Sequence, residues 1–236
     1  MTENNLQFQT ELNQLFEKYQ DAFELPYLNE IVARKPLFSE TPMTAEVLIT
    51  SINPSYRKRQ DHLSAASYDF YSKAALKDAY FKKYHNLFKA YIEHYNFAYL
   101  DLFYQRHTEQ KDLKLFLSED QGVQFLKDQI TLSRKRIQQL SPKLIFVFNR
   151  YAANFWDLKP EKGIYTQAPW LGFTYETISE LDGLYRITGS LLSNKIPEPL
   201  KGNLVYFSTF LSYRTSKKAL QKVYDDIPEI MKIIEK

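Results

Sequence analysis

Four short apolar runs alternate with amphipathic segments along the chain. The runs are Ala45–Asn53, Phe97–Phe103, Leu144–Phe148 and Leu204–Leu211. Their length and their branched and aromatic residues favour buried strands over helices. Strands that are apolar on both faces and separated by helical segments are typical of a parallel sheet covered by helices. We therefore expect an α/β protein, a three-layer α/β/α sandwich around a central four-stranded parallel sheet.

Two further segments complete the predicted domain. Apolar residues recur three and four positions apart over 6–24, which predicts an N-terminal helix. The stretch 159–202 holds five of the six glycines and four of the ten prolines, so we expect an insertion or a long connection there. Within it, Asp182-Gly183 is a hairpin turn signal. No linker is visible, and residues 1–236 are expected to form a single domain.

Composition removes several kinds of chemistry. The chain has no Cys, which excludes disulfides, thiolate zinc sites and iron–sulfur clusters. The first glycine is Gly122, and neither a dinucleotide fingerprint nor a phosphate loop follows it. We expect no cofactor and no metal. The N-terminus is polar and no stretch nears the roughly 20 apolar residues of a membrane span, so we expect a cytoplasmic protein without a membrane partner. The net charge of +3 permits a nucleic-acid partner.

Polar residues follow each of the four predicted strands. They are the segment 53–56 (Asn-Pro-Ser-Tyr), Asp101, the pair Asn149-Arg150, and the segment 208–215. In a parallel sheet these ends meet at one edge, where ligands usually bind. The set has amides, hydroxyls, a carboxylate and arginines but no obvious nucleophile. Such groups position water, recognise a planar polar ligand and contact phosphates.

This ordered set of strand ends resembles the uracil-DNA glycosylase superfamily over roughly residues 45–220. The family's first motif reads approximately Gly-x-Asn-Pro-Gly, and residues 51–55 read Ser-Ile-Asn-Pro-Ser. Its second strand ends in a polar residue that reads the base, a position held here by Asp101. Its fourth strand ends in His-Pro-Ser, and Phe-Leu-Ser stands near that position at 210–212.

The chain also departs from that family pattern. Ser51 and Ser55 replace the glycines of the first motif, and no His lies at the end of the fourth strand. The base-reading position is Asp rather than the Asn of the best-known uracil enzymes. The absence of Cys excludes the iron–sulfur branch.

The resemblance implies a DNA repair glycosylase that flips a deaminated or damaged base and hydrolyses its N-glycosidic bond. Asn53 would be the catalytic residue and hold the attacking water through its side-chain carbonyl. Asp101 would read the base, and because an ionised Asp only accepts hydrogen bonds, it would match uracil poorly and favour an exocyclic amine. The alternatives are a strand-ending turn for Asn53, and a structural carboxylate that pairs with Arg106 or caps the next segment for Asp101.

Other candidates come from the same strand ends. Tyr68 and Phe70 would stack on the base, with core packing as the alternative, and Asn149 would complete the base-binding set. The DNA-binding candidates are Ser55, Tyr56, Arg57, Ser212, Tyr213 and Arg214. The partner would be DNA, single- or double-stranded, and the protein a monomer. The alternative function is a non-catalytic nucleic-acid or nucleotide-binding module, which the missing His favours. An unrelated α/β protein whose strand ends mimic the pattern is the third possibility.

Overall fold

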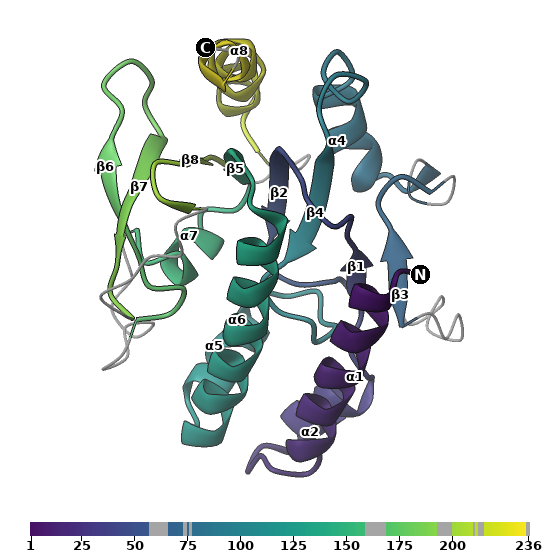
Figure 1. Cartoon of the computed structure of the whole chain (residues 1–236). Coiled ribbons are helices and arrows are strands. Elements are labelled where there is room, and N and C mark those ends of the chain that lie inside the picture. The colour runs from purple at the N-terminus through teal and green to yellow at the C-terminus, as the bar shows by residue number, and fades with distance from the viewer. Residues whose placement is uncertain are drawn as a thin grey trace.

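A six-stranded mixed sheet lies at the centre of the computed structural model (Figure 1). The structure describes residues 1–56, 66–72, 75, 77–158, 169–192, 200–209, 211 and 215–234. The strand order is β4-β2-β5-β8-β7-β6, in which β4, β2, β5 and β8 run parallel and β7 and β6 pair antiparallel. The strands are β2 (Val47–Ser51), β4 (Phe97–Asp101), β5 (Leu144–Val147), β6 (Phe173–Thr177), β7 (Leu184–Ser190) and β8 (Leu204–Phe207).

Helices cover both faces of this sheet (Figure 1). One face carries α1 (Glu3–Lys18), α2 (Pro26–Ala33), α5 (Lys111–Leu117), α6 (Asp120–Leu140) and α7 (Ala152–Phe155). The other carries α4 (Phe81–Leu87) and α8 (Lys217–Ile234). A small parallel sheet of β1 (Phe38–Glu40) and β3 (Ser67–Asp69) lies beside β4. No helix in the described residues is both long and apolar enough to cross a membrane.

The strands are apolar on both sides because each side faces helices. In β2, Leu48 belongs to the core under α1, α5 and α6, whereas Val47 and Ile49 belong to the core under α4 and α8. Phe146 and Val147 of β5 divide between the two cores in the same way. Successive side chains of a strand point to opposite faces, so a strand in this position needs apolar residues throughout.

The prediction of an α/β protein is confirmed, but the sheet differs from the expected four-stranded parallel one. Residues 159–202 do not simply connect two strands, because β6 and β7 come from this segment and extend the sheet past β8. Most of their side chains are only partly buried or exposed, as is usual for strands near the edge of a sheet, so no apolar run predicts them. The predicted hairpin is present, with a turn over 178–183 in which Gly183 has φ +93°.

The N-terminal helix is shifted relative to the predicted range 6–24. It begins at Glu3, because the Thr2 side chain accepts a hydrogen bond from the Asn5 backbone N–H and caps the first turn. It ends at Lys18, and Asp21 then takes a left-handed φ of 55°. A backbone in that region cannot continue a right-handed helix.

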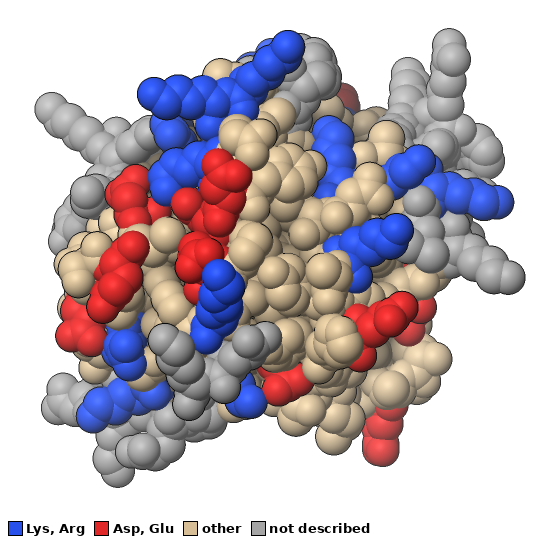
Figure 2. Space-filling model, turned by 90° about the horizontal axis from the view of Figure 1, so that it is seen from above, with Lys and Arg blue, Asp and Glu red and all other residues tan. Residues whose placement is uncertain are grey.

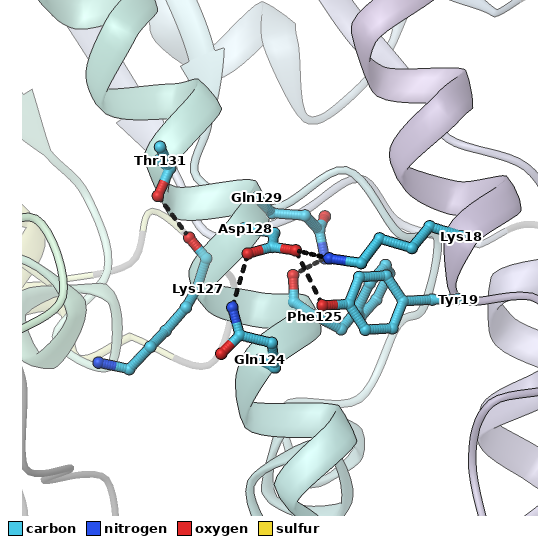
Figure 3. A network of polar contacts seen from close by, with 8 residues as sticks. All are labelled: Lys18, Tyr19, Gln124, Phe125, Lys127, Asp128, Gln129 and Thr131. Atoms are coloured by element: carbon cyan, nitrogen blue, oxygen red, sulfur yellow. Dashed lines mark hydrogen bonds and ion pairs between the residues drawn. The ribbon is translucent and has the colours of Figure 1, made fainter.

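A half-buried carboxylate joins α1 to α6 (Figure 3). Asp128 of α6 accepts hydrogen bonds from Lys18 and Tyr19, both at 2.8 Å, and from Gln124 at 2.7 Å. Burial raises the pKa of the Asp128 carboxyl, but the three hydrogen bonds outweigh it and hold the pKa below its usual value. The carboxylate therefore contributes stability in its ionised form.

Replacing this carboxylate is expected to destabilise the fold at neutral pH. Asp128→Ala should lower the free energy of unfolding by about 1–2 kcal/mol, because three donors lose their shared acceptor at a partly exposed site. Folding lowers the pKa of the Asp128 carboxyl below its value in the unfolded chain, which is near 3.9. The carboxylate therefore stabilises the fold fully above the unfolded pKa, and this stabilisation is lost as pH falls through the pKa of the folded state. Urea unfolding at pH 7 and pH 3 measures this. The control is Asp225→Ala at an exposed position on α8, where Asp225 pairs only with Gln221 among the described residues. An equal effect of both substitutions would contradict the assignment.

Candidate functional site

The carboxyl ends of β2 and β5 lie side by side, and the chain leaves them in opposite directions. From β2 it passes to α4 on one face, and from β5 it passes to α7 on the other. The register pairs Thr50 with Val147, and the Phe148 N–H still donates to the Thr50 carbonyl. A point where neighbouring strands send their connections to opposite faces is where open α/β sheets bind ligands. Asn53 and Asn149 follow the two strands at this point.

Asn53 is half-buried and its amide has one fixed orientation. Its Nδ2 donates to the carbonyl oxygen of His107 at 2.8 Å and to that of Pro54 at 2.9 Å. Because carbonyls only accept, the nitrogen must face them. No hydrogen bond among the described residues uses Oδ1 of Asn53. The side chain therefore offers a single acceptor, oriented by two backbone groups.

The loops that follow β2 and β4 run together beyond the sheet. The His107 N–H donates to the Pro54 carbonyl, and the Thr108 hydroxyl donates to the Tyr56 carbonyl at 2.9 Å. His107 is buried, and burial together with the nearby Arg34 charge lowers the pKa of its imidazole to about 4. It is therefore neutral at pH 7. The sequence pattern missed His107, because its contribution to Asn53 is a backbone carbonyl.

Asn149 is also buried and oriented. Its Oδ1 accepts hydrogen bonds from the Tyr151 N–H at 2.9 Å and from Gln110 Nε2 at 3.2 Å. The Gln110 contact joins the N-terminal end of α5 to the end of β5. Its Nδ2 takes part in no hydrogen bond among the described residues, so Asn149 offers a donor next in sequence to Arg150.

Asp101 lies at the end of β4 and is 2% exposed. Its carboxylate accepts hydrogen bonds from Tyr68 at 2.8 Å and from Tyr99 at 3.1 Å. Burial raises the pKa of the Asp101 carboxyl to about 7, although these two hydrogen bonds lower it. Among the described residues these two tyrosines are the hydrogen-bond partners of the carboxylate, and the Arg106 guanidinium donates to the Arg34 carbonyl. Tyr99 lies two residues before Asp101 in β4. Side chains two residues apart in a strand point to the same face, so the sequence could have indicated this partner.

Tyrosine hydroxyls extend from Asp101 to the end of β2. Tyr80 donates to the Ser51 hydroxyl at 2.8 Å and lies 3.2 Å from the Tyr99 hydroxyl. Tyr84 donates to Tyr80 at 2.9 Å. These hydroxyls thus lie in a row between Ser51 and Asp101, on the face of the sheet that carries α4. Much of the high aromatic content of the chain is used in this buried cluster.

The structure does not present Phe70 for stacking on a ligand. Phe70 is 2% exposed, and its ring stacks on His85 with centroids 4.5 Å apart and on Tyr99 at 5.4 Å. This is core packing, the alternative interpretation, and it follows from the aromatic cluster under α4. Tyr68 is half-buried, but its hydroxyl binds Asp101 and its ring packs on Phe81 at 5.2 Å. Tyr68 therefore contacts the site through its hydrogen bond to the Asp101 carboxylate.

The DNA-binding candidates fall into two groups. Ser55 is exposed beside Asn53, and the ring of half-buried Tyr56 lies 4.1 Å from the Arg34 guanidinium. The remaining candidates lie outside the described residues; they are Arg57, Ser212, Tyr213 and Arg214.

A cavity of about 550 Å³ lies one strand farther along the same edge of the sheet. Its wall includes Arg150 after β5, Ser208 and Thr209 after β8, Tyr185 of β7 and Lys222 of α8. Among the described residues no three His, Asp or Glu side chains gather in a way that could hold a metal ion. The site chemistry is thus that of amides, hydroxyls and single cations.

Comparison with known proteins gives no family assignment. The chain matches no protein-family model, and no curated protein matches it significantly.

Proposed function

We propose that the protein is a monofunctional DNA glycosylase, which hydrolyses the N-glycosidic bond of a deaminated or damaged base. The observation that carries the proposal is the fixed amide of Asn53, whose nitrogen is held by two backbone carbonyls and whose oxygen accepts no hydrogen bond from the described residues. An oriented carbonyl acceptor can place one water for attack on a sugar carbon. It is too weak a base to ionise that water, which suits a reaction in which the base departs first.

The position of Asn53 supports the proposal. It stands where β2 and β5 send the chain to opposite faces, and Asn149 stands at the end of the neighbouring strand. One residue offers an acceptor and the other a donor. The edge of a nucleobase carries both donors and acceptors, so this pair suits recognition of an extruded base. The resemblance of residues 51–55 to the first uracil-DNA glycosylase motif points to the same chemistry and to a uracil-DNA glycosylase-like fold.

Asp101 enters this proposal differently from a direct reader of the base. Both of its hydrogen-bond partners among the described residues are tyrosines, and the Tyr68 hydroxyl donates to it at 2.8 Å. Contact with a base would require Tyr68 to move aside. Otherwise Asp101 acts through Tyr68, whose hydroxyl it orients.

A second function has two observations in its favour. No His follows β8 in the sequence, and the carboxylate of Asp101 is already occupied by tyrosines. Both favour a module that binds nucleic acid or a nucleotide without cleaving it. The oxygen of Asn53, which accepts no hydrogen bond from the described residues, favours the enzyme, since binding alone needs no water-holding group.

A strand-cleavage assay separates the two. The purified protein is incubated with oligonucleotides that carry uracil, hypoxanthine, xanthine or a mismatch, in single- and double-stranded form, and alkali then reveals abasic sites. We expect base release from at least one of these substrates. Binding of the same oligonucleotides without any base release would replace the glycosylase with the non-catalytic module.

A further inference from the structure

The cavity at the carboxyl ends of β5 and β8 has one cation that no described group neutralises. Arg150 is exposed and makes no hydrogen bond or ion pair within the described part of the chain. Lys222, on the opposite wall, is 2.6 Å from the Asp226 carboxylate and 4.0 Å from that of Asp182. The sheet order places Arg150 nearer to β2, and Asp182 lies in the turn between β6 and β7. The uncompensated positive charge therefore lies on the side of the cavity that faces Asn53.

Hydroxyl donors stand on the wall next to this cation. Ser208 and Thr209 are half-buried and follow β8 directly, and the Ser208 N–H donates to the Val147 carbonyl of neighbouring β5. A guanidinium beside hydroxyl groups is the usual protein partner of a phosphate. The volume of about 550 Å³ holds a nucleotide-sized group, and Tyr185 and Phe207 provide aromatic wall. The cavity suits a phosphate ester that brings a sugar and base with it.

We infer that this cavity binds a phosphodiester group of the DNA strand whose target nucleotide lies over Asn53. Arg150 supplies the charge, and Thr209 donates a hydrogen bond to a phosphate oxygen, whereas the Ser208 hydroxyl is held by Tyr206. Two strand spacings, roughly 10 Å in all, separate β2 from β8. At the duplex rise of about 3.4 Å per nucleotide, that distance corresponds to roughly three nucleotides along the helix axis. The strand would thus cross the sheet edge from β2 over β5 to β8. The inference rests on the proposed function.

The face of the molecule that α4 and α8 form carries charges of both signs. Its visible Lys and Arg side chains are interspersed with Asp and Glu (Figure 2). A surface of mixed charge attracts a polyanion weakly, so an uncompensated cation at the sheet edge has a measurable share in DNA affinity.

Salt-dependent DNA binding tests this assignment. Fluorescence anisotropy with a labelled, lesion-free single-stranded oligonucleotide gives the dissociation constant at several NaCl concentrations. For Arg150→Gln we expect roughly tenfold weaker binding at low salt and a slope of log K against log [NaCl] that is smaller by about 0.7, the value for one phosphate contact. Because Arg150 is exposed, the melting temperature of the Arg150→Gln variant should equal that of the wild type.

Lys89→Gln is the matched control. Lys89 is exposed just after α4, next to Phe88, whose ring contacts Phe97 at the amino end of β4. The substitution removes the same charge from the opposite edge of the sheet. Equal affinities and equal slopes for the two variants would overturn the inference, as would the absence of any DNA binding by the wild type.

Two further measurements, binding of deoxythymidine monophosphate and the strand-cleavage assay, separate the possible outcomes. If deoxythymidine monophosphate binds the wild type but not Arg150→Gln, while the variant binds DNA as the Lys89→Gln control does, the cavity takes a free nucleotide and the DNA assignment is wrong. If Arg150→Gln lowers DNA affinity and slope but no substrate is ever cleaved, the phosphate site stands and the glycosylase proposal fails. If a substrate is cleaved but the slopes of the two variants are equal, the glycosylase proposal stands and the phosphate site fails.

Discussion

Asn53→Ala is expected to lower the rate of base release by roughly 100-fold or more while leaving DNA affinity within about twofold of the wild type. The methyl side chain cannot hold the water that Oδ1 would orient, and loss of one such positioning group typically costs two to three orders of magnitude. Single-turnover cleavage of the best substrate, measured beside anisotropy with the same DNA, separates the chemical step from binding.

Two companion variants sharpen this measurement. Asn86→Ala removes the same kind of side chain from an exposed position on α4 and should leave the rate unchanged. Asn53→Asp would place a carboxylate against the carbonyls of His107 and Pro54, which can donate no hydrogen bond to it. We expect it to lose activity as well and to lower stability by about 1–3 kcal/mol. An Asn53→Ala enzyme as fast as Asn86→Ala would remove the role given to Asn53.

The contribution of Asp101 to the stability of the protein is expected to fall between pH 4 and pH 7. Burial raises the pKa of this carboxyl to about 7, above its unfolded value near 3.9. A group whose pKa is raised by folding gives its full stability below the unfolded pKa and loses it as pH rises through the folded pKa. The difference of about 3 pKa units corresponds to a loss of up to roughly 4 kcal/mol.

Asp101→Asn should abolish this part of the pH dependence. An amide fits between Tyr68 and Tyr99, since it can accept from one hydroxyl and donate to the other. We therefore expect the variant to be the more stable protein at pH 8 and to lose that advantage at pH 4. Urea unfolding of both proteins across this range measures the difference, in which the neutral, buried His107 contributes equally to both and cancels. A difference that stays constant with pH would show that Asp101 is ionised throughout.

The four parallel strands were predictable because they are buried on both faces. Such strands need apolar residues at every position, and the runs at 47–51 and 144–147 are therefore visible in the sequence alone. β6 and β7 were missed because few of their side chains are fully buried and Gly189 interrupts β7. Nothing in a glycine-containing segment of mixed apolar and polar residues distinguishes a connection from the edge of a sheet.

The candidate site was predictable only to the level of strand ends. The position of Asn53 after β2 follows from the pattern, but its orientation depends on the carbonyl of His107, 54 residues away. A backbone carbonyl carries no sequence signal. The partners of Asp101 were expected to be an arginine or a cap, whereas the tyrosines come from β3 and β4. Aromatic residues that are typical of an ordinary core also supply the hydroxyls that satisfy this carboxylate.

The strand order has a consequence for how the chain assembles. β2 lies between β4, about 50 residues later, and β5, about 97 residues later. During synthesis β2 can therefore complete its first ladder early, but its second edge stays open until Val147 has emerged. Until then Val47, Leu48 and Ile49 form an unpaired apolar edge, the kind of surface on which chains aggregate. Long-range pairing at the centre of the sheet makes this the slow and vulnerable stage of folding.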